Sequence, residues 1–256
     1  MANSNDLGGV VAKELHIFYI LDTSGSMNTS GKISALNDAM RSTVEELRDF
    51  NRKSPDATCK IAVMQFDNSA RWITINSAGQ PVMLEMDDFE WDDLTANGMT
   101  ELGKALQELK ENLTRDSLQK SDTGNKAPII IFMSDGQPTG SWKPQLEELN
   151  RNGWYEAAIK IAFPLGDEAD RDVLKEVIGY SPNKENTAII ETENLADFVN
   201  KLQVVSIQSV NVVSKGTSVN ISNMNNPQKN SEPTPTPEPT PDDYPPIVFS
   251  QETYFE

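Results

Sequence analysis

The sequence of 256 residues contains a single cysteine, Cys59, and a single histidine, His16. One cysteine excludes an internal disulfide, and lone thiols are usual in reducing compartments. A Ser-His-Asp or Cys-His catalytic arrangement would have to be built around His16. Because His16 lies inside an apolar stretch, we expect it to be a packed or hydrogen-bonded residue rather than a catalyst. Cys59, at the start of an expected strand, is predicted to be a buried small apolar residue.

Long hydrophobic runs are also missing. No apolar stretch approaches the roughly 18 residues that a membrane span needs. Met1 is followed by polar residues at 2–6, without the basic segment and apolar run of a secretory signal. We therefore predict a protein with no membrane span and a cytoplasmic location.

Positive charge is scarce relative to negative charge. The chain has 39 acidic and 22 basic residues, which gives a formal net charge of −17. This balance argues against binding nucleic acid through bulk electrostatics and favours cations or basic partner surfaces. Hydrophobic residues make up 37% of the chain, enough for a substantial core together with a soluble extension.

The last part of the chain differs in composition from the rest. Residues 231–256 contain seven prolines and six acidic residues but no lysine or arginine. The alternating Thr-Pro run favours an extended polyproline II spacer. We therefore expect a flexible N-terminus at 1–12, a folded domain at 13–213, a Ser/Asn-rich and then Thr-Pro-rich linker at 214–241, and an acidic, aromatic tail peptide at 242–256. The tail peptide has the composition of a short docking segment, and the alternative is a tail that only solubilises the protein.

The folded part alternates apolar runs with segments of helical periodicity. Near-continuous apolar runs at 15–21 and 129–133 are typical of strands buried on both faces. Further strands are predicted at 60–66 and 71–75 as a hairpin, at 157–165 and at 187–190, and helices at 33–47, 102–113, 144–150, 170–178 and from 194. This alternation predicts an α/β fold: a doubly wound, mostly parallel central sheet with helices on both faces.

Three polar clusters fall where strands of this sheet should end. Asp22, Ser24 and Ser26 follow the first strand, Thr100 precedes a long helix, and Asp135 follows the strand at 129–133. Ligands bind outside the carboxyl ends of the strands in open α/β sheets. Carboxylates and hydroxyls are hard oxygen ligands that suit Mg²⁺, Mn²⁺ or Ca²⁺. Taken singly, the first cluster could instead form a helix-capping turn, Thr100 could be a helix N-cap, and Asp135 could belong to an ordinary turn.

Taken together, the three clusters resemble the metal-ion-dependent adhesion site of the von Willebrand factor type A domain. That family's pattern is Asp-x-Ser-x-Ser, a distant Thr, and a distant Asp that ends a hydrophobic strand; Asp22, Ser24, Ser26, Thr100 and Asp135 match it in order. The resemblance covers roughly residues 13–210. The local sequences around Asp22 and Asp135 are most similar to those of intracellular bacterial members of the family. These include members encoded beside tellurium-resistance genes, often together with a kinase and a phosphatase.

The resemblance implies a function as well as a fold. Asp22, Ser24, Ser26 and Thr100 would approach one divalent ion, with Asp135 binding directly or through water. A carboxylate of a partner protein would fill an open coordination position, so the protein would be an adaptor and not an enzyme. The tail peptide would be a second contact, for a kinase or phosphatase from the same operon, or would bind its own metal site. Residues 97–99 depart from the glycine-rich loops of many relatives, which predicts a less mobile loop before Thr100.

A rival function is Mg²⁺-dependent phosphoryl transfer of the haloacid dehalogenase kind, which also uses an Asp after the first strand. Such enzymes need a second Asp two residues on as general acid, and Ser24 stands there. A third reading is a domain that binds partners without metal.

Two further groups of residues each allow two interpretations. The acidic cluster at 87–93 could bind a second cation or form a solvated loop. Trp142 and Trp154 could form an exposed partner surface or pack in the core. Three threonines of the Thr-Pro-rich linker are candidate phosphorylation sites; they are Thr234, Thr236 and Thr240.

Overall fold

The computed structural model describes residues 12–53, 57–135 and 137–216. They form a seven-stranded sheet in the order β3-β2-β1-β5-β6-β7, with β4 also paired to β2. The strands are β1 (Lys13–Asp22), β2 (Ala57–Phe66), β3 (Ala70–Trp72), β4 (Leu84–Glu85), β5 (Ile129–Ser134), β6 (Ile159–Pro164) and β7 (Thr187–Ile189). Only β3 and β4 run antiparallel to their neighbour among these strands.

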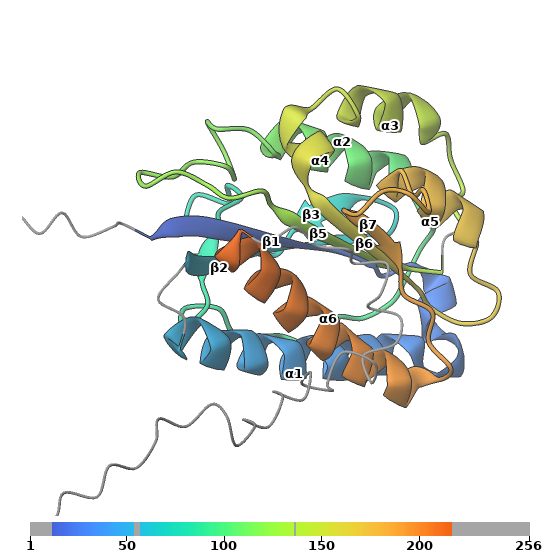
Figure 1. The fold of residues 1–256 in the computed structure, drawn as a ribbon. Helices are drawn as coiled ribbons and strands as arrows, with labels where there is room; N and C mark the ends of the chain where they lie inside the picture. Colours follow the sequence, from blue (N-terminus) through green and yellow to red (C-terminus); the bar gives the residue numbers. More distant parts are fainter. Residues whose placement is uncertain (1–11, 54–56, 136, 217–256) are drawn as a thin grey trace, which may run out of the picture. The chain divides into compact units, whose positions relative to one another are not determined.

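Helices cover both faces of the sheet (Figure 1). The helices on one face are α1 (Lys32–Lys53) and α6 (Leu195–Lys215). Those on the other face are α2 (Leu102–Asn112), α3 (Lys143–Leu149), α4 (Gly153–Ala157) and α5 (Arg171–Ile178). The predicted doubly wound α/β architecture is therefore confirmed.

The central strand β1 shows why the sequence folds in this way. Its side chains alternate between the two faces, so Ile17 and Tyr19 pack in the layer under α1 and α6, while Phe18 and Ile20 pack against α2 and α3. Tyr19 is completely buried, and its hydroxyl donates a hydrogen bond of 3.0 Å to Ser206 of α6. A strand that is apolar on both faces is stable only when both faces are covered.

The carboxyl ends of β1 and β5 lie side by side, because these strands are parallel neighbours in register from Ile17 and Ile129 onward. The chain leaves β1 through a short 3₁₀ turn at Gly25–Gly31. Ser30 and Gly31 then adopt left-handed conformations, with φ of 54° and 74°. This sharp bend lets α1 start at Lys32, close to the sheet edge.

Several element boundaries differ from the sequence predictions. The hairpin of β2 and β3 is confirmed, but β4 and α4 were not predicted. Because α4 ends at Ala157, β6 begins at Ile159 rather than at 157. Helix α6 continues to Lys215, two residues past the expected domain end at 213, and ends at Gly216, whose φ is 64°. The tail peptide at 242–256 and the three threonines of the preceding linker lie outside the described residues.

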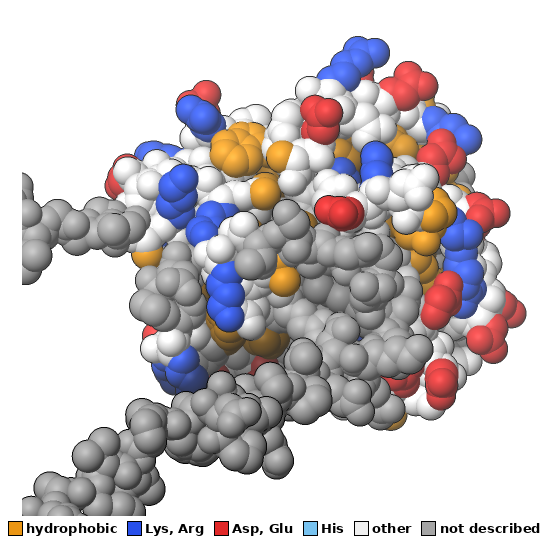
Figure 2. All heavy atoms as spheres, in the orientation of Figure 1, with side chains coloured by type: hydrophobic (Ala, Val, Ile, Leu, Met, Phe, Trp, Pro, Cys, Tyr) orange, Lys and Arg blue, Asp and Glu red, His pale blue; other side chains and the backbone are white. Residues whose placement is uncertain are grey.

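In the part of the chain that the structure describes, no helix is long and apolar enough to cross a membrane. The face of the molecule in Figure 2 carries acidic and basic side chains interspersed with one another.

Candidate metal centre

Asp22 is the last residue of β1 and is completely buried. Each oxygen of its carboxylate accepts one hydrogen bond. The backbone N–H of Ser24 donates to Oδ1 at 2.8 Å, and the hydroxyl of Ser134, the last residue of β5, donates to Oδ2 at 2.5 Å. Because a carboxylate oxygen has two lone pairs, both oxygens retain capacity for a further ligand.

Ser24 and Ser26 lie in the loop that follows Asp22. Their hydroxyl oxygens are 3.0 Å apart, with Ser24 buried and Ser26 exposed to solvent. Ser24 occupies the position before the 3₁₀ turn, but its side chain makes no capping hydrogen bond. Helix capping therefore does not account for the Ser24 hydroxyl.

Thr100 is 5% exposed and is brought to the same edge by backbone hydrogen bonds between two loops. The N–H of Gly25 donates to the carbonyl of Gly98 at 2.9 Å, and the N–H of Asn97 donates to the carbonyl of Thr23 at 2.8 Å. A Cβ at position 25 would lie 3.1 Å from that same Gly98 oxygen, so a larger residue there would press the two loops apart by a few tenths of an ångström. Helix α2 begins two residues after Thr100.

A third loop supports the segment before Thr100. The side-chain carbonyl of Asn68 accepts a hydrogen bond of 2.9 Å from the N–H of Met99, and the carbonyl of Asp67 accepts one from Glu101. Gly98 has a φ of +78° and packs directly against the Asn68 side chain. These contacts attach the loop to its neighbour, and the expectation of a less mobile loop stays a prediction.

Asp135 follows β5 and is 2% exposed. Its Oδ2 lies 3.4 Å from the ammonium of Lys32, the first residue of α1. Its Oδ1 is buried and has no hydrogen-bond partner among the residues that the structure describes. An unpaired buried carboxylate oxygen is unfavourable unless another group, such as a cation, binds it.

The two carboxylates interact with each other. Burial raises the pKa of Asp22 above its ordinary value, hydrogen bonds from Ser134 and Ser24 oppose that rise, and the charge of Asp135 adds to it. A divalent ion would relieve this repulsion. Among the described residues no three His, Cys, Asp or Glu side chains gather as a metal site. The donors at this edge are thus two carboxylates with hydroxyls, a set that suits a hard cation.

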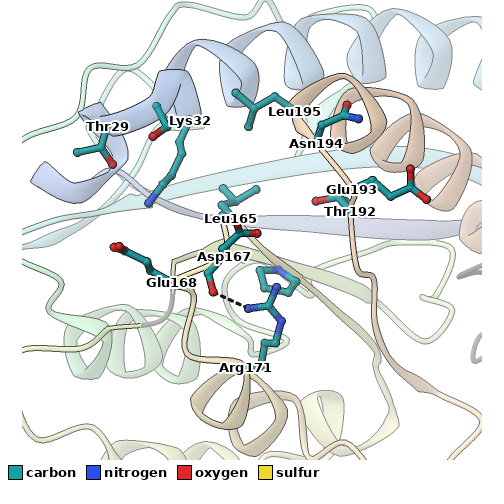
Figure 3. A pocket seen from close by; sticks show the side chains of 13 residues that line it. Thr29, Lys32, Leu165, Asp167, Glu168, Arg171, Thr192, Glu193, Asn194 and Leu195 are labelled. Carbon is teal, nitrogen blue, oxygen red and sulfur yellow. Dashed lines mark hydrogen bonds between the residues drawn. The ribbon is translucent and has the colours of Figure 1, made fainter.

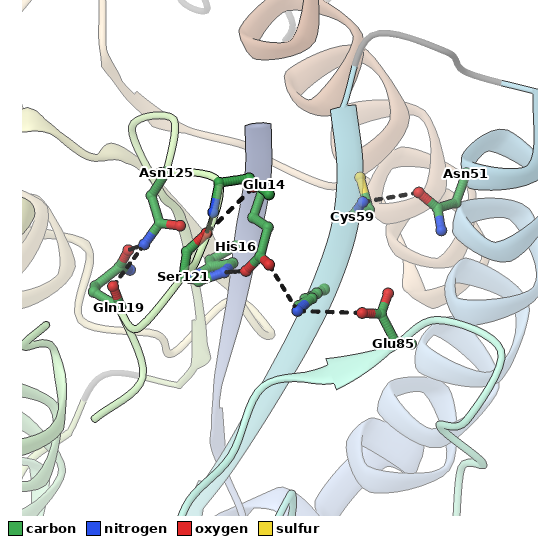
Figure 4. A network of polar contacts seen from close by, with 10 residues as sticks. Glu14, His16, Asn51, Cys59, Glu85, Gln119, Ser121 and Asn125 are labelled. Atoms are coloured by element: carbon green, nitrogen blue, oxygen red, sulfur yellow. Dashed lines mark hydrogen bonds and ion pairs between the residues drawn. The ribbon is translucent and has the colours of Figure 1, made fainter. Parts of the chain in front are cut away.

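His16 and Cys59 lie toward the other end of the sheet (Figure 4). The buried His16 ring pairs through Nε2 with Glu14 at 3.0 Å, and Glu14 also pairs with Lys60 at 2.9 Å. Burial lowers the pKa of His16. His16 is six residues before Asp22 in one strand, about 20 Å away at 3.3 Å per residue. The prediction of a packed, hydrogen-bonded histidine is confirmed. Cys59 is likewise fully buried, as predicted.

The acidic cluster at 87–93 is largely paired with arginines of α1. Arg52 contacts Asp87 at 2.7 Å, Arg41 contacts Asp93, and Arg48 donates to the backbone carbonyls of Met86 and Phe89. These contacts use the cluster's charge to attach a loop to a helix. They favour the loop interpretation over a second cation site.

Trp142 and Trp154 pack with the core layer under α2, α3 and α5. Trp142 is 7% exposed and lies beneath Lys143, while Trp154 is half-buried beneath Arg115. The alternative of an exposed partner surface built from the two tryptophans is therefore wrong.

Sequence reasoning missed Lys32, Asn68 and the hydroxyl of Ser134. The sequence does contain one indication for Lys32. A cation in the first turn of a helix is unfavourable because it opposes the helix dipole, so a lysine at that position indicates a role other than helix stabilisation. Asn68 carried no such signal, because its contact with Met99 joins loops 31 residues apart.

The sequence and the fold are both similar to those of known proteins. Residues 17–137 match the family model of the von Willebrand factor type A domain. Among solved structures, the chain is similar to a von Willebrand factor type A protein from Catenulispora acidiphila, with 15% identity and a TM-score of 0.52 over 78% of this chain and 43% of that one. It is also similar to the ArnB paralog VWA2 from Sulfolobus acidocaldarius, with 16% identity and a TM-score of 0.51 over 75% of this chain and 44% of that one.

A third similar structure is the proximal thread matrix protein 1 of the mussel byssus, solved with a zinc-occupied metal-ion-dependent adhesion site. It shows 18% identity and a TM-score of 0.51 over 77% of this chain and 46% of that one. The chain thus spans less than half the length of each of these three structures, and identities this low indicate the fold alone. No curated protein matches the chain.

Proposed function

We propose that this chain, which contains a von Willebrand factor type A domain, binds a carboxylate of a partner protein through a divalent cation. The main support for this proposal is a pair of buried carboxylates at the adjacent ends of β1 and β5. One of them has an oxygen without a hydrogen-bond partner in the described part of the chain. Asp22, Ser24, Ser26, Thr100 and Asp135 are the proposed ligands, with Mg²⁺ or Mn²⁺ as the ion.

Each side chain has a distinct task in this proposal. Asp22 and Asp135 supply negative charge from buried positions, where electrostatic attraction to a cation is stronger than in bulk water. The hydroxyls of Ser24, Ser26 and Thr100 add neutral oxygens, so the bound ion keeps part of its positive charge. Ser26 is exposed, which leaves the site open to solvent and to a partner on that side. The bound ion supplies the attraction for the partner's acidic side chain.

The test is calorimetric titration of the full chain with Mg²⁺ and with Mn²⁺. We expect binding to the wild-type protein, and loss of binding in Asp22→Ala and Asp135→Ala. Asp122→Ala is the matched control, because Asp122 is exposed and its removal changes the net charge equally. Absence of binding to the wild-type protein would refute the metal-dependent function.

The adaptor role and the tail are finer parts of the same proposal. We propose that residues 242–256 form a second contact, for a kinase, a phosphatase or the metal site itself. Comparing the full chain with one ending at Gly216 tests the last option, because a carboxylate supplied by the tail would make metal binding tighter in the full chain. Equal affinities would exclude the tail as a ligand.

The rival function, phosphoryl transfer, predicts turnover of p-nitrophenyl phosphate with Mg²⁺. We expect none above the level of Asp22→Ala, because Ser24 cannot replace a carboxylic acid as proton donor.

A further inference from the structure

Lys32 brings a positive charge to the edge of the sheet where the two carboxylates lie. It is 7% exposed, and its ammonium lies 3.4 Å from Oδ2 of Asp135. The stem of the side chain packs on Gly166, where an added Cβ would lie 3.1 Å from the Lys32 Cε. The lysine is therefore held against the proposed metal site by packing as well as by charge.

This position is unfavourable for a lysine in two respects. Burial removes most of the water around its ammonium, and the first turn of α1 carries the positive end of the helix dipole. The contact with Asp135 is the one charge contact that the described residues show for Lys32. A lysine in this unfavourable position points to a role at the proposed metal site.

Lys32 also lines a cleft next to the site, of about 520 Å³. The cleft lies at the carboxyl ends of β6 and β7, between the start of α1 and the start of α6. Glu168 projects into it from the side opposite Lys32 (Figure 3). The cleft thus gives an anionic partner a way to approach Lys32 and the proposed metal site together.

We propose that Lys32 is a specificity-determining residue of the metal site. In the metal-free protein its ammonium neutralises Asp135, and in the metal-loaded protein it adds a second positive charge beside the ion. This inference rests on the proposed function, because it assigns Lys32 a role toward the same ion.

Counting charges shows what the lysine changes. Asp22, Asp135 and a divalent ion sum to zero, and Lys32 raises the sum to +1. The loaded site then attracts a single carboxylate and becomes neutral when it is bound. The same charge repels the metal ion, so Lys32 weakens metal binding while it favours the anionic partner.

The first experiment measures Mn²⁺ affinity by calorimetry on full-length variants. We expect Lys32→Met to bind Mn²⁺ about tenfold more tightly than the wild-type protein, since like charges no longer repel. Lys32→Arg keeps the charge and should stay near the wild-type affinity. Lys110→Met, which removes an equal charge from the far half of α2, is the control and should change nothing.

The second experiment separates this role from a structural one. In EDTA, Lys32→Met should melt below the wild-type protein, because Asp135 is left buried without a counter-charge. In saturating Mn²⁺ the difference should disappear, since the ion then neutralises Asp135. An equal difference in both conditions would show a structural lysine and would overturn the inference.

The third experiment uses acetate as a probe of the loaded site. Acetate binding to the Mn²⁺ protein, followed by water proton relaxation, should be several-fold weaker in Lys32→Met than in the wild-type protein. If the wild-type protein binds no Mn²⁺, the proposed function itself fails. If it binds Mn²⁺ and Lys32→Met shows unchanged affinities for Mn²⁺ and acetate, the function stands and the inference about Lys32 fails.

Discussion

The hydroxyl of Ser134 donates a hydrogen bond of 2.5 Å to the carboxylate of Asp22, which lies 112 residues earlier in the chain. This bond joins the last residues of two neighbouring strands, β1 and β5. It also opposes the rise in the pKa of Asp22 that burial causes. Ser134 therefore helps to keep Asp22 ionised at the sheet edge.

Ser134→Ala should destabilise the metal-free protein by about 1–3 kcal/mol at pH 7, because a buried carboxylate loses a hydrogen bond. The loss of the bond raises the pKa of Asp22 further in the folded state only. Stability that depends on a raised carboxyl pKa is present at low pH and is lost as pH rises through the folded pKa. The deficit should therefore be smaller at about pH 4 than at pH 7.

Urea unfolding of wild-type and Ser134→Ala protein at the two pH values, with EDTA present, measures this. Ser42→Ala is the control, since its exposed hydroxyl donates only to a carbonyl of its own helix. A deficit that is the same at both pH values would contradict the assignment of the effect to Asp22.

Gly98→Ala should be more damaging than Gly79→Ala, although the two glycines have almost the same φ, +78° and +77°. Both substitutions strain a left-handed backbone, at about 1–2 kcal/mol. Only at position 98 would the new Cβ also collide, at 2.4 Å from the amide nitrogen of Asn68. The difference between the two variants isolates the contact between the loops.

We expect Gly98→Ala to lose stability beyond Gly79→Ala and, in addition, to bind Mn²⁺ more weakly, because Thr100 is displaced with its loop. Calorimetry and urea unfolding on both variants check this. Equal losses, with Mn²⁺ affinity unchanged in both, would show that Asn68 yields freely to the new methyl group.

The sequence was most informative where one short segment determines its own structure. The apolar runs of β1 and β5 fix two central strands, and the Asp-x-Ser-x-Ser motif falls at a strand end. These patterns were enough to predict the sheet and to bring Asp22 and Asp135 to one edge. Helix α4 was missed because it has five residues and depends on Asn152, whose side chain accepts from the N–H groups of Trp154 and Tyr155. The contact of Lys32 with Asp135 spans 103 residues and depends on the bend at Ser30, which no local pattern specifies.

The thiol of Cys59 should be unreactive in the folded protein. It is completely buried at the start of β2, and burial raises its pKa to about 12, so almost no thiolate is present at neutral pH. We expect no reaction with 5,5′-dithiobis(2-nitrobenzoic acid) at pH 8 over the time in which the urea-unfolded chain reacts completely. Fast reaction in native buffer would mean that β2 opens readily at this end.

Lys160 should make the unfolding free energy depend on pH between about 8 and 10.5. Lys160 is 5% exposed on β6. Its ammonium donates a hydrogen bond of 2.7 Å to the carbonyl of Tyr155 and lies 4.7 Å from the centre of the Tyr155 ring. Burial lowers the pKa of Lys160 to about 8, and the nearby charge of Lys184 acts in the same direction. The unfolded chain holds the proton up to about pH 10.4.

In this window the unfolded state binds more protons than the folded state, so the unfolding free energy rises with pH. Below pH 8 both states are protonated, and the full cost of burying the charge remains. Relative to Lys160→Met, the wild-type protein should thus gain about 1–3 kcal/mol between pH 7.5 and pH 10. Taking the difference between the two proteins removes the titration of every other group. Lys175→Met, which removes an equal charge from a half-exposed lysine paired with Asp172, is the matched control variant. A flat difference for Lys160→Met would mean that its ammonium keeps enough water to titrate as an ordinary lysine.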